Sequence, residues 1–72
     1  MAFRDFAPFT SSSIQALRYD EGTQVLQVLF NNGGVYEYYG VPARMAEEFE
    51  RSESKGVFLA ANLKGHYRYS RV

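Results

Sequence analysis

The residues able to do covalent or acid–base chemistry are few in this 72-residue chain. His66 is the sole histidine, cysteine is absent, and the nearest group of nucleophiles is the serine run at residues 11–13. Catalysis by these types needs a hydroxyl or thiol beside a base, or titratable groups held in contrasting surroundings. No spacing links the serines to His66, which stands among basic and aromatic neighbours. We therefore expect that the protein is not an enzyme and has no catalytic residue.

Metal and cofactor sites have as little support in the sequence. One histidine and scattered carboxylates lack any recognisable ligand spacing, and a chain without cysteine can form neither a disulfide nor a thiolate site. Gly33 and Gly34 follow two asparagines in an expected turn and do not open a helix, so they do not form a phosphate-binding loop. We expect no metal and no cofactor.

Aromatic and basic side chains offer a different chemistry, that of binding. Tyrosine rings can stack on RNA bases while lysine and arginine contact phosphates. Eight basic and eight acidic residues cancel, which excludes the strong overall field of typical nucleic-acid-binding proteins. Residues 54–72, however, hold four cations and no acid. Weak RNA binding would use the cations Lys55, Lys64, Arg68 and Arg71 together with the rings of Tyr67, Tyr69 and Tyr39.

A small α+β fold has to position these residues. Residues 13–19 favour a strand with an irregular start, residues 24–30 alternate as a clear strand, and residues 35–39 return antiparallel to it. Asn32 and Gly33 between the last two predict a type I′ hairpin turn. Residues 42–51 form an amphipathic helix behind Pro42, and Ser54 caps a second short helix that Gly65 ends. Residues 66–72 close the order β-β-β-α-α-β.

The expected architecture is a small antiparallel sheet of three to four strands with two short helices packed on one face. Period-two geometry sends Tyr36 and Tyr38 to one face and Tyr39 to the other. We expect Tyr36 and Tyr38 to pack against Met45 and Phe49 of the first helix, although stacking on a ligand remains the alternative.

An aromatic arm, residues 1–10, precedes the domain that spans residues 11–72. Phe3, Phe6 and Phe9 would form an exposed apolar patch if they were left uncovered. Phe6 or Phe9 is expected to cover the second face of the chain's own sheet, at Val25, Leu29 and Tyr39. The alternative is that the arm covers a partner's sheet in a homodimer. Asp5 and Pro8 exclude a signal peptide, and no run reaches membrane-spanning length, so we expect a cytoplasmic protein.

An ordered set of short motifs resembles the KTSC domain, a family named for its occurrence at the C-terminus of some lysyl-tRNA synthetases. The motifs are "SSSI", "YD", "L-x-V-x-F", "GGVYEY", "GVP", "SKG" and "KGHYRY", and they run from Ser11 to the C-terminus. The resemblance implies a single-domain bacterial protein of a family without an assigned function, in which RNA binding is suggested by the synthetase context. Its motif positions are Tyr36, Tyr38, Ser54, Gly56, Lys64, Gly65, Tyr67 and Tyr69.

The chain departs from this pattern in two places. Leu59, Ala60 and Ala61 stand where the family often carries aromatic, polar and basic residues, while Arg68 stands where proline is common. The first departure removes polar character and the second adds one positive charge. The sequence thus predicts a non-enzymatic binding module, with RNA (tRNA) as the leading ligand. Protein interaction or self-association through the arm and the sheet face is the alternative.

Overall fold

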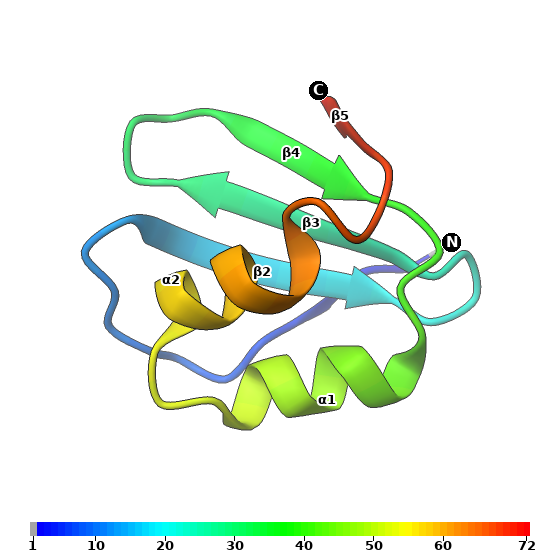
Figure 1. Cartoon of the computed structure of the whole chain (residues 1–72), viewed down its shortest axis with the longest axis horizontal. Coiled ribbons are helices and arrows are strands. Elements are labelled where there is room, and N and C mark those ends of the chain that lie inside the picture. Colours follow the sequence, from blue (N-terminus) through cyan, green and yellow to red (C-terminus); the bar gives the residue numbers. More distant parts are fainter. Residues whose placement is uncertain (1) are drawn as a thin grey trace.

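A five-stranded antiparallel sheet carries the fold, as the computed structural model shows for residues 2–72 (Figure 1). Met1, the first residue of the expected arm, lies outside the described residues. The strands follow in spatial order as β1 (Arg4–Asp5), β2 (Ile14–Asp20), β3 (Val25–Phe30), β4 (Val35–Tyr38) and β5 (Tyr69–Arg71). The predicted α+β class is confirmed. The sheet has more strands than the three or four expected, because two arm residues pair with β2.

The helices lie together in the connection between β4 and β5. They are α1 (Ala43–Arg51), α2 (Lys55–Phe58) and a π-helical turn, η1 (Leu59–Leu63), that continues α2. As predicted, Ser54 caps α2 by accepting a hydrogen bond from the Val57 N–H at 3.3 Å. Gly65 ends the segment at φ +81°, a left-handed conformation that glycine adopts at little cost. Both helices pack on one face of the sheet, here called the inner face (Figure 1).

The β3–β4 hairpin is confirmed, but its turn differs from the prediction. The Gly33 N–H donates to the Phe30 carbonyl and the Phe30 N–H to the Gly34 carbonyl, both at 2.9 Å, which encloses residues 31–33 as the loop. A type I′ turn needs positive φ at both central residues. In the described chain Gly33 has φ +92°, whereas Asn32 is not among the residues with positive φ. One glycine after two ordinary turn residues is enough to reverse the chain in a three-residue loop.

The core lies between the inner face and the helices. Strand alternation buries Leu26 and Val28 of β3 and Leu17 of β2, and α1 contributes Phe49, which is fully buried. An irregular step between Ile14 and Ala16, as the sequence indicated, returns Ile14 to the same core. The largest fully buried side chains are Phe49, Ile14, Leu26, Leu59, Leu63, Val28 and Val41.

The arm contributes to this core, so the expectation that Phe6 or Phe9 covers the second sheet face is wrong. The Phe6 N–H donates to the Leu17 carbonyl, and the Phe6 ring meets Phe49 edge-on with centroids 5.7 Å apart. Phe9 packs against the same core. Only Phe3 stays on the outer face, where the Arg18 guanidinium lies 4.8 Å from its ring. Because Phe6 continues the pairing with β2, period-two alternation directs its side chain to the inner face.

A carboxylate on α1 holds the arm in place. Glu50 accepts hydrogen bonds from the Ala7 N–H at 2.9 Å and from the Arg4 guanidinium at 3.1 Å. The backbone hydrogen bond from Ala7, followed by the contribution of Arg4, lowers the pKa of Glu50. The arm is therefore attached to its own domain by both an aromatic contact and a charged one.

A candidate ligand-binding groove between the second helix and strand β5

The inner face changes character from its centre to its β5 edge. One row of directly paired residues runs Leu17, Val28, Tyr36, Arg71, and the next runs Tyr19, Leu26, Tyr38, Tyr69. Paired residues share a face, so each row passes from two buried core residues to a tyrosine of β4 and then to an exposed residue of β5. The helices cover the β2 and β3 part of the face, and β4 with β5 extends beyond them (Figure 1). An uncovered aromatic strip remains at this edge.

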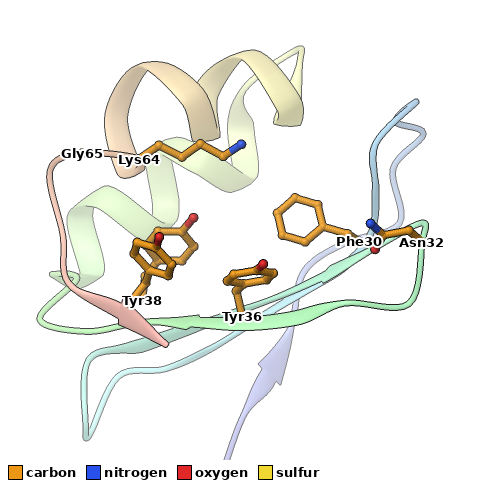
Figure 2. Close-up of a pocket in the computed structure, with 7 residues that line it drawn as sticks. Phe30, Asn32, Tyr36, Tyr38, Lys64 and Gly65 are labelled. Atoms are coloured by element: carbon orange, nitrogen blue, oxygen red, sulfur yellow. The ribbon is translucent and has the colours of Figure 1, made fainter. Parts of the chain in front are cut away.

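A groove of about 450 Å³ lies over that strip. It is lined by Phe30, Asn32, Tyr36, Tyr38, Lys64, Gly65 and Tyr69. Figure 2 shows Tyr36 and Tyr38 rising from the strand toward the segment that carries Lys64 and Gly65, with Phe30 and Asn32 at the opposite end. The end of the second helix and the β3–β4 loop thus enclose the tyrosines between them.

The rings of the groove are packed against one another. Phe30 meets Tyr36 edge-on at 5.5 Å, and Tyr69 lies 5.8 Å from Tyr36 and 5.6 Å from Tyr38 at tilted angles. Tyr38 is buried, Tyr36 is half-buried, and Tyr69 is 58% exposed. Tyr36 and Tyr38 face the helix side, but the aromatic pairs that they form are with Phe30 and Tyr69. The ring of Phe49, expected with Met45 as their partner, pairs with Phe6 and Phe58. Among the rings of the groove, that of Tyr69 alone is largely open.

The tyrosine hydroxyls add hydrogen-bond donors to the groove. In the described residues the hydroxyls of Tyr36, Tyr38 and Tyr69 make no hydrogen bond to protein, and no fully buried side-chain polar atom lacks a partner. The Tyr38 hydroxyl must therefore reach the groove although its ring is covered. Burial of the ring, with a smaller contribution from Tyr69 and Tyr36, raises the pKa of Tyr38. A tyrosine is already protonated at neutral pH, and a raised pKa keeps this hydroxyl able to donate.

The π-helical turn η1 positions Lys64 above the groove. The Lys64 N–H donates to the Leu59 carbonyl at 2.9 Å, five residues back, and the Asn62 side-chain amide donates to the Phe58 carbonyl at 3.3 Å. Such wide turns are rare and frequently occur at functional sites. Buried Leu59 and Leu63 anchor the turn in the core, so Lys64 emerges at its exposed end, with Nζ 5.9 Å from the Phe30 ring centroid.

Two further polar groups meet at the Phe30 end of the groove. A Cβ placed on Gly34 would lie 4.0 Å from Arg71 Nη2 and 3.2 Å from Asn32 Oδ1, which puts both side chains at the hairpin loop. The Asn32 oxygen accepts from the Gly34 N–H at 2.9 Å, so its amide N–H groups remain available. Within the described chain, neither Lys64 nor Arg71 has an acidic partner within 4 Å. The groove therefore combines one open ring, that of Tyr69, with positive charge that has no acidic partner in the described residues.

The structure does not bring all of the predicted binding residues together. Lys55 is only 6% exposed; its Nζ donates to the Ser52 carbonyl at 2.6 Å and lies 5.4 Å from the Phe9 ring. Tyr67 is half-buried against the core, and Arg68 is exposed just before β5 without lining the groove. Tyr39 is half-buried, and its hydroxyl donates to Glu37 at 3.4 Å on the outer face. Of the predicted residues, Lys64 and Tyr69 line the groove, and Arg71 lies beside it at the hairpin loop.

The family-like serine and "SKG" segments have a packing role in the structure. They line a separate polar hollow, where a Cβ on Gly56 would approach the Ser13 hydroxyl to 3.0 Å. Only glycine permits that approach without a shift. The Ser11 hydroxyl accepts from the N–H groups of Ser13 and Ile14 and so shapes the entry to β2.

Residues 2–72 contain neither a cluster of metal-binding side chains nor a membrane-spanning helix. No group of three or more His, Cys, Asp or Glu side chains in this part of the chain is placed to hold a metal ion. No helix there is long and apolar enough to cross a membrane.

The sequence is similar to parts of lysine–tRNA ligases and to a small bacterial protein. The chain is 38% identical over 61 residues to a lysine–tRNA ligase from a Nostoc species, and this match covers 85% of the chain but 11% of the ligase. It is 36% identical over 63 residues to an uncharacterized protein from Stutzerimonas stutzeri, covering 86% of the chain and 89% of that protein. The chain thus spans about a tenth of the length of the ligases that it matches.

A solved structure and a family match agree on the identity of the fold. The crystal structure of a KTSC domain protein from Yersinia pestis superposes with a TM-score of 0.90 at 32% identity, covering 99% of both chains. The KTSC domain family matches residues 10–67, which include both tyrosines of β4 and Lys64. This chain therefore belongs to the KTSC domain family.

Proposed function

We propose that this KTSC domain binds single-stranded RNA through the groove between the second helix and strand β5. The observation that carries the proposal is the presence of Lys64 and Arg71, without acidic partners in the described residues, beside the open ring of Tyr69. Single strands are bound by stacking bases on aromatic side chains while cations contact the phosphates. Duplex RNA is recognised across a wide minor groove, and a concave site of about 450 Å³ does not present such a surface.

The relatives give independent support. A lysine–tRNA ligase acts on an RNA, and a domain related to this chain forms part of several such ligases. An accessory RNA contact would suit that setting, and a neutral chain with two cations at the site would supply a weak one. Transfer RNA, through its unpaired regions, is the natural first ligand to examine.

The test is a titration of the isotope-labelled protein with a single-stranded RNA dodecamer, followed by NMR. We expect shifts in the groove residues and an affinity that falls only mildly with salt. Counterion release contributes a slope of about −0.7 per neutralised phosphate, so two cations give about −1.4, or about a sevenfold loss between 50 and 200 mM salt. Unchanged spectra in excess RNA at low salt would end the proposal.

Matched variants locate the binding site. Lys64→Gln combined with Arg71→Gln should weaken binding by about tenfold or more, since a hydrogen bond to a charged group is worth about 1.5 to 3 kcal/mol. Arg44→Gln with Arg51→Gln removes the same charge from the exposed side of α1, where Arg44 already lies 3.6 Å from Glu48. That control should bind as the parent does. Equal losses in both pairs would show general charge attraction and no groove.

Self-association is a second candidate, supported by one apolar row on the outer face. Ala16, Leu29 and Val35 are paired side by side across three strands there, on the face opposite to both helices. The arm itself gives less support, because Phe6 is buried in the chain's own core. If a second copy covers this row, Leu29→Asp should convert a dimer into a monomer in sedimentation experiments. A parent protein that stays monomeric at high concentration would exclude it.

A further inference from the structure

We infer that the groove accommodates one nucleotide and does not track a strand, with the base at the Tyr69 end and the phosphate between Lys64 and Arg71. This inference rests on the proposed RNA-binding function and specifies its ligand. A surface that follows an RNA strand differs from a one-nucleotide pocket in three respects. These are the number of ring faces free to stack on bases, the number of cations available to phosphates, and the length of the groove. The groove points to one nucleotide on all three counts.

The number of free ring faces limits the number of bases. Tyr38 is 3% exposed, and half-buried Tyr36 has Phe30 on one side and Tyr69 on the other at centroid distances of 5.5 and 5.8 Å. A base cannot enter between rings that already touch. Tyr69, at 58% exposed, is therefore the single platform on which a base can stack.

The cations are placed for one phosphate. Lys64 lines the groove, with Nζ 5.9 Å from the Phe30 ring centroid. Arg71 does not line it, but a Cβ on Gly34 would lie 4.0 Å from Arg71 Nη2, so Arg71 borders the same Phe30 end. The side-chain amide of Asn32 lies at this end too. Only its oxygen is occupied, by the Gly34 N–H, so its N–H groups are free to donate. An ammonium, a guanidinium and an amide together form a suitable donor set for one phosphate group. Lys55 is buried and is not available for a second phosphate.

The dimensions agree with this count. The β3–β4 loop closes one end of the groove, and the helix segment with Lys64 and Gly65 overhangs the tyrosines (Figure 2). Its volume of about 450 Å³ falls in the range of small-molecule sites, about 300 to 1,000 Å³. Surfaces that follow a strand accommodate about 4 to 16 nucleotides per domain.

The inference is tested by the dependence of affinity on chain length. Uridine and adenosine 5′-monophosphate, a dinucleotide and the dodecamer are titrated separately, and affinity is expressed per nucleotide. We expect values equal within about threefold, since each added nucleotide gains no further ring or cation. A free nucleotide and a nucleotide within RNA are the two sources of the same chemistry, and this series compares them directly.

The possible results separate the two proposals. A tracking surface would gain about 1 to 3 kcal/mol per stacked base, a rise of about fivefold or more with each added nucleotide, and that result would overturn this inference but leave RNA binding intact. If neither the dodecamer nor the monophosphates bind, both proposals fail.

Two controls test the ligand orientation. The nucleosides, which lack phosphate, should bind the parent about tenfold more weakly than the monophosphates, and Lys64→Gln with Arg71→Gln should remove that preference. Shifts on adding a monophosphate should be confined to the groove residues, including the side-chain amide of Asn32. Equal affinity of nucleoside and monophosphate would overturn the assigned phosphate end.

Discussion

The two faces of the sheet both carry charged and aromatic residues, yet they differ in how those residues are partnered. On the outer face the paired residues Arg18, Gln27 and Glu37 form a row across β2, β3 and β4. Arg18 donates to Gln27 at 2.6 Å and Gln27 donates to Glu37 at 3.1 Å. The Gln27 amide thus links one cation to one carboxylate, so this row carries no net charge to offer a ligand.

The groove on the inner face has the opposite arrangement. Lys64 and Arg71 have no acidic neighbour within 4 Å in the described residues, and the hydroxyls of the three tyrosines have no protein partner there. The opposite charges of Arg18 and Glu37 balance within the outer row and bring little net field to a ligand, whereas Lys64 and Arg71 have no such balancing carboxylate and keep their field beside the low-dielectric rings. A binding surface is thus identified by whether its charges are balanced by neighbouring side chains, and not by residue type alone.

The largest expected effect is on the free energy of unfolding, and it distinguishes two phenylalanines of the arm. Phe6→Ala should cost about 3 to 5 kcal/mol of unfolding free energy, because it leaves a cavity against Phe49. Phe3→Ala removes the same ring from the outer face, where it lies beside the Arg18 guanidinium and is half-buried, and should cost about 1 kcal/mol or less. Chemical denaturation of both variants measures the difference. Similar losses would show that the outer face contributes to the core as much as the inner face does.

A smaller effect is expected on RNA affinity, and it distinguishes two tyrosines on opposite faces of the sheet. Tyr69→Ala should weaken RNA binding by about 1 to 3 kcal/mol, since it removes the open ring of the groove. Tyr39→Ala, on the outer face, removes a half-buried ring whose hydroxyl donates to Glu37 and should leave affinity unchanged. Fluorescence anisotropy with labelled RNA measures both. A loss with Tyr39→Ala alone would move the binding site to the outer face.

Much of the fold follows from local sequence pattern. The alternation of residues 24–30, Pro42 before an amphipathic stretch, and Ser54 and Gly65 at the ends of the second helix each predict a local structure from neighbouring residues. Strand β1 could not be predicted in this way, because a strand of two residues is too short to show an alternation of apolar and polar side chains. Its pairing depends on Phe6 reaching Phe49, a contact that joins distant parts of the chain.

The candidate site was predictable where its residues form one segment. Lys64, Tyr69 and Arg71 belong to the basic C-terminal stretch and were identified from composition. Phe30 and Asn32 were missed, since no sequence signal indicates that the end of β3 meets the end of the second helix. The sequence wrongly places Lys55 among the binding residues. Its burial depends on tertiary contacts with the Ser52 carbonyl and the Phe9 ring, which the sequence does not reveal.

The smallest expected effect is on the pH dependence of stability, and it distinguishes two glutamates. Glu50 joins the arm to α1, and its hydrogen bond from the Ala7 N–H, together with Arg4, lowers its pKa in the folded chain. A carboxyl with a lowered folded-state pKa stabilises the fold above its ordinary value of about 4.3. That contribution is lost as the pH falls through the lower folded-state pKa. Glu50→Gln should therefore cost about 1 kcal/mol at neutral pH, because glutamine keeps an acceptor for Ala7 and loses only the charge.

The pH dependence distinguishes this attachment from a general loss of packing. The difference in unfolding free energy between the parent and Glu50→Gln should be largest near neutral pH and should shrink toward zero below about pH 4, where the parent carboxyl also becomes neutral. Glu37→Gln is the matched control, because Glu37 accepts from Gln27 on the outer face and does not contact the arm. Amide hydrogen exchange should report faster exchange at Phe6 and Ala7 in Glu50→Gln, whereas Glu37→Gln should leave these amides unchanged. A difference in unfolding free energy that stays constant with pH would show that the Glu50 charge does not hold the arm and that shape alone does.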